Sequence, residues 1–290
     1  MKRIITLALA AVMLLSAAFA FSACSDKKVE CVATDAADLL KEDFGIAVKK
    51  GNTELLGKVN EVINEWVTNG TMTKYVEYYD AMAKGENADA GDLKTSWDFG
   101  SASEIITVYT ESGFAPFEFV KDNNVIGVDI AIMSEVAQRA GKKLEIKDVD
   151  FNTITTSVKT SSGDAVGAAG ITITDERSEE VDFSSIYYSS TLVIVTAKDK
   201  VISKVADLSK LKVGVQEGTS GDLIISAARG EGHTFEDEDE KTQTIKVDSS
   251  TDVRRYKQYG LALADLKAGR IDAILMDKLP AQTMLAASDN

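Results

Sequence analysis

Between residues 104 and 290, short apolar runs alternate with longer stretches whose apolar residues recur at helical spacing. Such runs predict buried strands, and the stretches between them predict helices. Strands are expected at 105–109, 143–149, 164–169, 191–196, 212–215, 244–247 and 272–276. The clearest helix is expected at 128–140, before Gly141, and another at 252–268, before Gly269. Alternating strands and helices are typical of α/β units with parallel sheets.

A second structured block precedes residue 83. FGIAV at 44–48 predicts a strand, and apolar residues then recur at helical spacing up to a stop at Asn69-Gly70. Another helix follows, and core packing explains the row of tyrosines that it carries. The segment 83–103 is polar, contains glycines and lacks periodicity, which predicts a linker. Trp97 and Phe99 within it are expected to dock on a surface.

The N-terminus predicts a processing segment. Two basic residues precede an apolar run at 4–21, and small residues lead from it to Cys24, which is typical of a secretory signal peptide at 1–23. FSAC at 21–24 resembles the bacterial lipoprotein box, with Phe21 as its one departure, so we expect Cys24 to carry lipid. Two alternatives stay open: ordinary cleavage after AFA at 18–20, or an uncleaved anchor, for which the run is about long enough.

Composition and charge narrow the class of function. The chain has 290 residues, 44% of them hydrophobic and 27% charged, which suffices for two globular domains or one large one. Its formal net charge of −14 would repel a phosphate backbone, so nucleic acid is not expected as a partner. One histidine, His233, and two cysteines, Cys24 and Cys31, cannot form a zinc site of His and Cys ligands or a disulfide framework. We therefore expect no metal and no cofactor, and a structural role for Cys31.

Candidate binding residues follow several predicted strands, where open α/β sheets place their ligands. After the first strand, the turn GFAPFEF puts Phe114 and Phe117 either over a cleft or in the core. After the third, backbone amides near Gly170, the Thr172 hydroxyl and the Arg177 guanidinium suit a carboxylate, because arginine offers a planar pair of donors. A surface ion pair with a neighbouring acid is the alternative role for Arg177.

Two further strand ends carry polar groups. VQEGTSGD at 215–222 combines a strand end, a glycine turn and a helix start, whose free amides bind anions. It lacks the lysine of a nucleotide-binding P-loop, so ATP is excluded. Asp277 follows the last strand, where a carboxylate could hold an ammonium group. Plain helix capping would also explain both features.

Together these motifs resemble the bacterial extracellular solute-binding proteins for polar amino acids, which have the type II periplasmic-binding fold. The resemblance covers nearly the whole chain after the signal peptide. Its motifs are GFAPFEF, GVDIAIMSEVAQRAG, DFNTI, AAGITITDERSEEVDFSSIYYSS, KVGVQEGTSGD and GRIDAILMDKLPA, in the family's order. The resemblance implies an α/β fold of two lobes, each a mostly parallel sheet flanked by helices, that close over the ligand.

The resemblance also implies how the α-carboxylate of an amino acid would be held. The residues expected to bind it are Gly170, Thr172 and Arg177, with help from Thr219 and Ser220.

The remaining roles that the resemblance implies concern the other parts of the ligand. Phe114 and Phe151 would sandwich it, and Asp277 would take its α-ammonium group. Gln216 and Glu111 would line the side-chain pocket. A carboxylate at Glu111 favours glutamine, arginine, lysine or histidine, and it disfavours glutamate and aspartate by like charge.

One feature departs from the family's order. The equivalent of the block at 44–82 comes last in that family and first here, which predicts a circular permutation joined by the linker 83–103. A duplicated fragment ahead of a truncated end is the alternative. In the permuted interpretation, lobe 1 covers 49–189 with the linker, and lobe 2 combines 28–48 with 190–290.

The resemblance implies a receptor and not an enzyme. The expected protein is a monomer on the extracytoplasmic face of a bacterial cell membrane, attached only through its lipid. It would bind a free L-amino acid and deliver it to the permease of an ABC transporter. Two alternatives stay open: an enzyme of the same fold similar to cyclohexadienyl dehydratase, with Glu111 or Glu217 as its acid, and an amino-acid sensor module.

Overall fold

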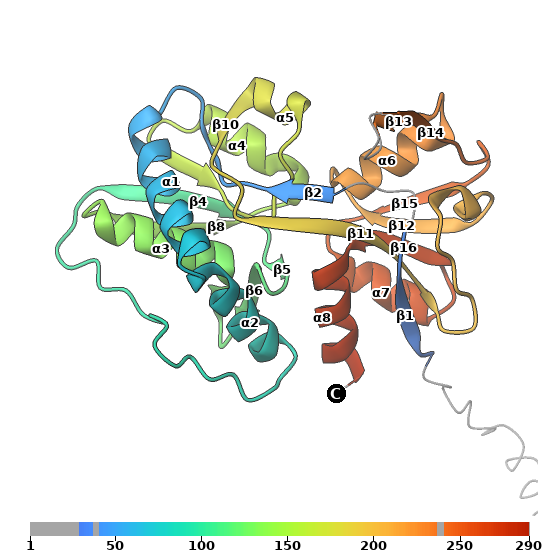
Figure 1. The fold of residues 1–290 in the computed structure, drawn as a ribbon, viewed down its shortest axis with the longest axis horizontal. Helices are drawn as coiled ribbons and strands as arrows, with labels where there is room; N and C mark the ends of the chain where they lie inside the picture. Colours follow the sequence, from blue (N-terminus) through green and yellow to red (C-terminus); the bar gives the residue numbers. More distant parts are fainter. Residues whose placement is uncertain (1–28, 37–40, 237–240, 290) are drawn as a thin grey trace, which may run out of the picture.

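The computed structural model describes residues 29–36, 41–236 and 241–289, which form two lobes lying side by side (Figure 1). Each lobe has a central β-sheet with helices on both faces. The signal peptide predicted at 1–23 and Cys24 lie outside the described residues. None of the helices in the described ranges is both long enough and apolar enough to cross a membrane.

The first lobe is built on a five-stranded sheet. In spatial order, its strands are β10 (Val181–Phe183), β3 (Ala47–Lys49), β9 (Asp164–Gly167), β4 (Ile105–Thr110) and β8 (Lys143–Asp148). β4 runs parallel to β8 and β9, whereas β3 is antiparallel to β9 and β10. Ile106 and Val108 of β4 face one helix layer and Tyr109 faces the other, because successive side chains of a strand alternate.

Helices cover both faces of this sheet. The helices on one face are α1 (Thr53–Thr68), α2 (Thr71–Ala83) and α3 (Val128–Arg139), and those on the other are α4 (Ile154–Thr160) and α5 (Asp175–Glu180). The side chain of Asn52 caps α1 by accepting a hydrogen bond from the Leu55 amide at 3.1 Å. A small sheet of β5 (Gly113–Phe114), β6 (Glu118–Lys121) and β7 (Asn124–Ile126) leads into α3.

The second lobe contains a six-stranded sheet. Its strands are β1 (Cys31–Asp35), β11 (Tyr188–Ala197), β16 (Ala273–Asp277), β12 (Lys212–Gln216) and β15 (Asp252–Tyr256) in spatial order, with β2 (Lys41–Phe44) also paired to β11. β12 is parallel to β15 and β16, and β11 is antiparallel to its three partners. The helices are α7 (Tyr259–Lys267) and α8 (Lys278–Asp289) on one face and α6 (Ser220–Arg229) on the other.

Two stretches of chain cross between the lobes, and they run antiparallel side by side (Figure 1). One leads from β2 to β3 and the other from β10 to β11. Backbone hydrogen bonds join them at the crossing, from the Tyr187 amide to the Phe44 carbonyl at 3.1 Å and from the Ser184 amide to the Ile46 carbonyl at 3.0 Å. The crossing is therefore a two-stranded hinge in which β2 and the start of β11 take part.

The α/β fold of two lobes is confirmed, but three details differ from the sequence prediction. Both sheets are mixed, because β3 and β11 enter antiparallel from the hinge. One helix was expected at 252–268, but the first residues of this stretch form strand β15 and only its second half is helical, as α7. The strand expected at 44–48 is split into β2 and β3, since the chain changes lobe at Gly45, where an added Cβ would lie 2.9 Å from a carbon of Ile173.

The predicted linker has no helix or strand in its described residues 84–103, and it is fastened along the first lobe. The Tyr75 hydroxyl donates to the Lys94 carbonyl at 2.8 Å, and the indole of Trp97 donates to Glu135 of α3 at 2.9 Å. Trp97 and Phe99 pack against the core of the lobe, so the docking predicted for these two side chains is confirmed.

Candidate functional site

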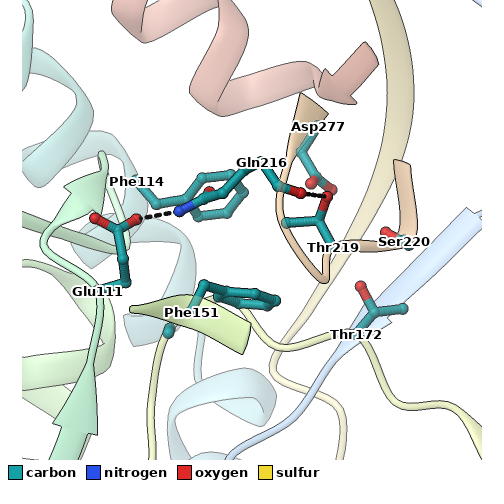
Figure 2. A pocket seen from close by; sticks show the side chains of 10 residues that line it. Glu111, Phe114, Phe151, Thr172, Gln216, Thr219, Ser220 and Asp277 are labelled. Carbon is teal, nitrogen blue, oxygen red and sulfur yellow. Dashed lines mark hydrogen bonds between the residues drawn. The ribbon is translucent and has the colours of Figure 1, made fainter. Parts of the chain in front are cut away.

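A narrow cavity lies between the lobes, at the carboxyl ends of β4, β9, β12 and β16. The side chains that line it leave about 10 Å³ free, which is room for about one water molecule. The lining residues are Glu111, Phe114, Phe151, Ala169, Gly170, Thr172, Gln216, Thr219, Ser220 and Asp277 (Figure 2). The structure thus brings together every residue that the sequence singled out for ligand binding except Arg177.

Two aromatic rings form part of the wall. Phe114 comes from β5, and Phe151 opens a short 3-10 helix, Phe151–Thr153. Gly170 has a left-handed φ of +55°, and an added Cβ there would lie 2.6 Å from the Phe114 ring. Only glycine allows the chain to pass so close to this ring. Phe117, the other candidate aromatic, is fully buried in the core.

One end of the cavity holds a buried carboxylate, Asp277, one oxygen of which lacks a hydrogen-bond partner among the described residues. Asp277 ends β16 and is 5% exposed. Its Oδ1 atom is inaccessible to solvent and has no hydrogen-bond partner among the described residues. Burial raises the pKa of Asp277 well above its usual range, and the nearby charge of Glu42 raises it further. A cationic group placed here would stabilise the ionised form of Asp277.

At the same end of the cavity, two hydroxyl groups donate hydrogen bonds to another buried acid, Glu42. The Thr172 hydroxyl of the first lobe donates to Glu42 Oε2 at 3.0 Å, and the Ser220 hydroxyl of the second lobe donates to the same atom at 2.6 Å. Burial raises the pKa of Glu42, while these two hydrogen bonds and Arg177 oppose the rise. Glu42 was not predicted from the sequence, because KEDF at 41–44 has the pattern of an exposed charged run.

Arg177 of α5 lies next to the cavity without lining it. Its guanidinium donates to the Thr172 carbonyl at 2.7 Å and across the lobes to the Gly218 carbonyl at 2.9 Å. It also lies over the Phe151 ring, 5.5 Å from the centroid. Burial lowers the pKa of Arg177, and the charges of Glu42 and Asp277 counteract this. The guanidinium therefore stands within electrostatic reach of the acidic end of the cavity.

The opposite end of the cavity is built around Glu111, which follows β4 (Figure 2). Its two oxygens accept hydrogen bonds from Gln216 Nε2 at 2.7 Å and from Gln258 Nε2 at 2.6 Å. Burial raises the pKa of Glu111. Gln258 precedes α7 and was not predicted from sequence, since it lies in a stretch expected to be helical.

Thr219 and Ser220 owe their positions to the start of α6. The Thr219 side chain caps this helix by accepting from the Asp222 amide, and its hydroxyl donates to the Gln216 carbonyl at 2.8 Å. In the part of the chain that the structure describes, no group of three or more His, Cys, Asp or Glu side chains could hold a metal ion.

Comparisons with known proteins point to one family. The model of "Bacterial extracellular solute-binding proteins, family 3" matches residues 106–258, more than half of the 290. The chain is 27% identical over 190 residues to the arginine-binding extracellular protein ArtP of Bacillus subtilis, covering 66% of this chain and 68% of ArtP. It is 30% identical over 187 residues to the ABC transporter arginine-binding protein 1 of Escherichia coli, covering 64% and 68%.

A solved structure agrees with these relatives. The arginine-bound form of truncated ArgBP from T. maritima is 32% identical, with a TM-score of 0.54 over 64% of this chain and 79% of that one. The family match, the relatives and the two-lobed α/β fold all lead to the same conclusion: the chain belongs to the bacterial extracellular solute-binding proteins, family 3.

Proposed function

We propose that this protein binds a free L-amino acid between its two lobes and delivers it to an ABC importer. The observation that carries the proposal is the buried Oδ1 atom of Asp277, which has no hydrogen-bond partner in the described part of the chain and which an α-ammonium group would satisfy. Hydroxyls of Thr172 and Ser220 lie at the same end of the cavity, where an α-carboxylate needs donors. A zwitterion uses both kinds of group at once.

The charges around the cavity favour a ligand with a positive side chain. Three acidic side chains, Glu42, Glu111 and Asp277, lie at the cavity. The positive charge of Arg177 acts on Glu42 and Asp277. A zwitterion adds no net charge, and burial raises the pKa of each of these acids, so a cationic side chain near Glu111 would stabilise its ionised form. Glu111 lies across the cavity from Asp277 (Figure 2), and we propose that the ligand side chain extends toward it. Arginine-binding relatives support this choice, and we propose arginine, ornithine, lysine or histidine.

A screen of the twenty amino acids, ornithine, citrulline and cystine by thermal shift tests the proposal. A ligand at 100 times its dissociation constant adds about 2.7 kcal/mol of stability, which raises the melting temperature measurably. We expect the largest shift with a cationic amino acid. If glutamate or leucine gives the largest shift, the charge argument is wrong, and if none of them gives a shift, the binding function is wrong.

We also propose that Cys24 carries a lipid that holds the protein on the extracytoplasmic face of the membrane. The FSAC sequence and the apolar run ahead of it support this assignment. We propose a receptor and not an enzyme, and we assign the candidate acid Glu111, whose oxygens accept two amide hydrogen bonds, to ligand binding. We propose a monomer, as the resemblance implies.

A circular permutation would explain how the block at 44–82 takes part in both lobes. β2 pairs with β11 in the second lobe, β3 pairs with β9 in the first, and α1 packs on α3. We therefore propose lobes at 49–189 and at 28–48 plus 190–290. β1 and α8 contact each other on the second lobe, so a short bridge can join them.

The test of the permutation is a rearranged soluble chain. It is opened within 84–103 and joined from residue 290 to about residue 28 by a glycine–serine bridge. We expect it to fold and to bind the same amino acid with similar affinity. If it fails to fold, or if a chain lacking 28–82 binds as well as the original, the permutation is wrong.

A further inference from the structure

Glu42 occupies a position that no sequence motif pointed to. It lies on β2, the strand that enters the hinge, and its side chain is 6% exposed. A buried carboxylate needs hydrogen-bond donors, and Glu42 finds them in one hydroxyl from each lobe. The structure therefore contains an internal carboxylate that bridges the two lobes at the edge of the cavity.

The two donors of Glu42 are the hydroxyls that the proposed function requires for the ligand. Thr172 and Ser220 both line the cavity, and both give their hydroxyl hydrogens to Glu42 Oε2. A hydroxyl has one hydrogen to donate, so it cannot serve Glu42 and a second carboxylate at the same time. The charges that surround Glu42 are those of Arg177 and Asp277, the groups expected at the two ends of an amino-acid backbone.

We infer that Glu42 holds the place of the ligand's α-carboxylate, and that an amino acid must displace it from Thr172 and Ser220 in order to bind. This inference rests on the proposed function, because it assigns the same two hydroxyls to the ligand. Glu42 is then an internal competitor that lowers the affinity for amino acids.

The inference predicts opposite effects for ligands with and without a carboxylate. An amino acid competes with Glu42, so removing Glu42 strengthens its binding. The decarboxylated amine of the same amino acid does not need the hydroxyls, and Glu42 supplies the missing negative charge beside it. Removing Glu42 therefore weakens binding of the amine. A merely structural role for Glu42 would change both affinities in the same direction.

The experiment is calorimetry with L-arginine and agmatine, which is arginine without its carboxylate, and with histidine and histamine as a second pair. The variants are Glu42→Ala and the isosteric Glu42→Gln, which serves if the alanine variant does not fold. We expect Glu42→Ala to bind the amino acid about tenfold more tightly, which is about 1.4 kcal/mol. Glu42→Gln should show a smaller gain than Glu42→Ala, because its amide oxygen still accepts from the two hydroxyls, although less strongly than a carboxylate does.

Asp43→Ala is the matched control. Asp43 is the next residue of the same strand, and its carboxylate accepts from the Ser189 hydroxyl at 2.5 Å on the other side of the strand. This variant removes the same charge near the hinge and should leave both affinities unchanged. Equal effects of the two substitutions would mean that long-range charge, and not competition for the hydroxyls, explains the result.

The outcomes separate the inference from the proposed function. If wild type and the Glu42 variants bind the amino acid equally, or if the variants bind it more weakly, the inference is wrong and the proposed function stands. If only the variants bind, Glu42 is a strong competitor and both statements hold. If neither wild type nor the variants bind any amino acid of the two pairs or of the screen, both are wrong.

Discussion

Replacing Asp277 by asparagine should have opposite effects on ligand binding and on the stability of the free protein. The substitution keeps the shape of the side chain and removes its charge. Asp277 Oδ1 is buried, and no residue that the structure describes hydrogen-bonds to it, so in the proposed complex it is the group that pairs with the α-ammonium. Removing one member of such a buried pair costs about 2–5 kcal/mol. We therefore expect the affinity to fall by about 30-fold to several-thousand-fold.

The stability of the free protein should change in the other direction. Burial raises the pKa of Asp277 in the folded state, so between the unfolded pKa and the folded pKa the folded protein binds more protons than the unfolded chain. The free energy of unfolding of wild type therefore falls as the pH rises through this window, by up to about 1.4 kcal/mol per pH unit. The free energy of unfolding of Asp277→Asn does not fall in this way. The difference in stability between this variant and wild type should therefore grow in favour of the variant from acidic pH to pH 8.

Calorimetry and urea unfolding between pH 4 and pH 8 measure the two effects. The ligand's ammonium favours the ionised carboxylate, so wild-type affinity should increase with pH across the window and binding should release a proton. Asp272→Asn is the control: Asp272 precedes the same strand and accepts from the Lys212 amide at 3.0 Å, away from the cavity. Affinity of Asp277→Asn within threefold of wild type would refute the assignment of the ammonium.

Three further predictions concern the lobes and the membrane. Arg177→Ala should weaken ligand binding, measured by calorimetry, by about 2–5 kcal/mol. Arg177→Lys should not restore it, because one ammonium group cannot replace the planar guanidinium that donates to two carbonyls. Gly218→Ala should weaken binding more than tenfold while Gly260→Ala does not, because Gly218 has a φ of +81° and its added Cβ would lie 2.8 Å from Asn152 of the other lobe. Cys24→Ser should move the protein from the membrane fraction to the soluble fraction or leave it unprocessed, and unchanged detergent partitioning would contradict the lipid.

The central strands were predictable because their signal is local. β4, β9, β12 and β16 lie between helix layers, so their sequences are short apolar runs. Strand β15 was missed because DVRRY at the edge of the sheet is mostly polar and none of its residues is fully buried. Its pairing with β12 is set by the neighbouring strand and not by its own pattern.

The cavity could be predicted largely because parallel strands end at the same edge of a sheet. Glu111, Gln216 and Asp277 each stand at or just after such an end, so their convergence follows from topology. Glu42 and Gln258 escaped prediction because the burial of Glu42 and the hydrogen bond of Gln258 to Glu111 depend on the approach of the two lobes. No local pattern marks a charged residue that finds its donors 130 and 178 positions away in the sequence.

Several of the contacts that join the lobes around the cavity are polar, and this affects how a ligand can control them. Glu42 joins Thr172 to Ser220, and Arg177 reaches the Gly218 carbonyl. Glu111 accepts from Gln216, and Lys257 pairs with Asp150. Each such hydrogen bond contributes only about 0.5–3 kcal/mol net, because water replaces it when the lobes part. A ligand shifts an equilibrium between open and closed lobes by its differential affinity for the two. An amino acid that replaces Glu42 between the same two hydroxyls adds little to closure at that point, so the differential affinity must come mainly from its ammonium group and its side chain.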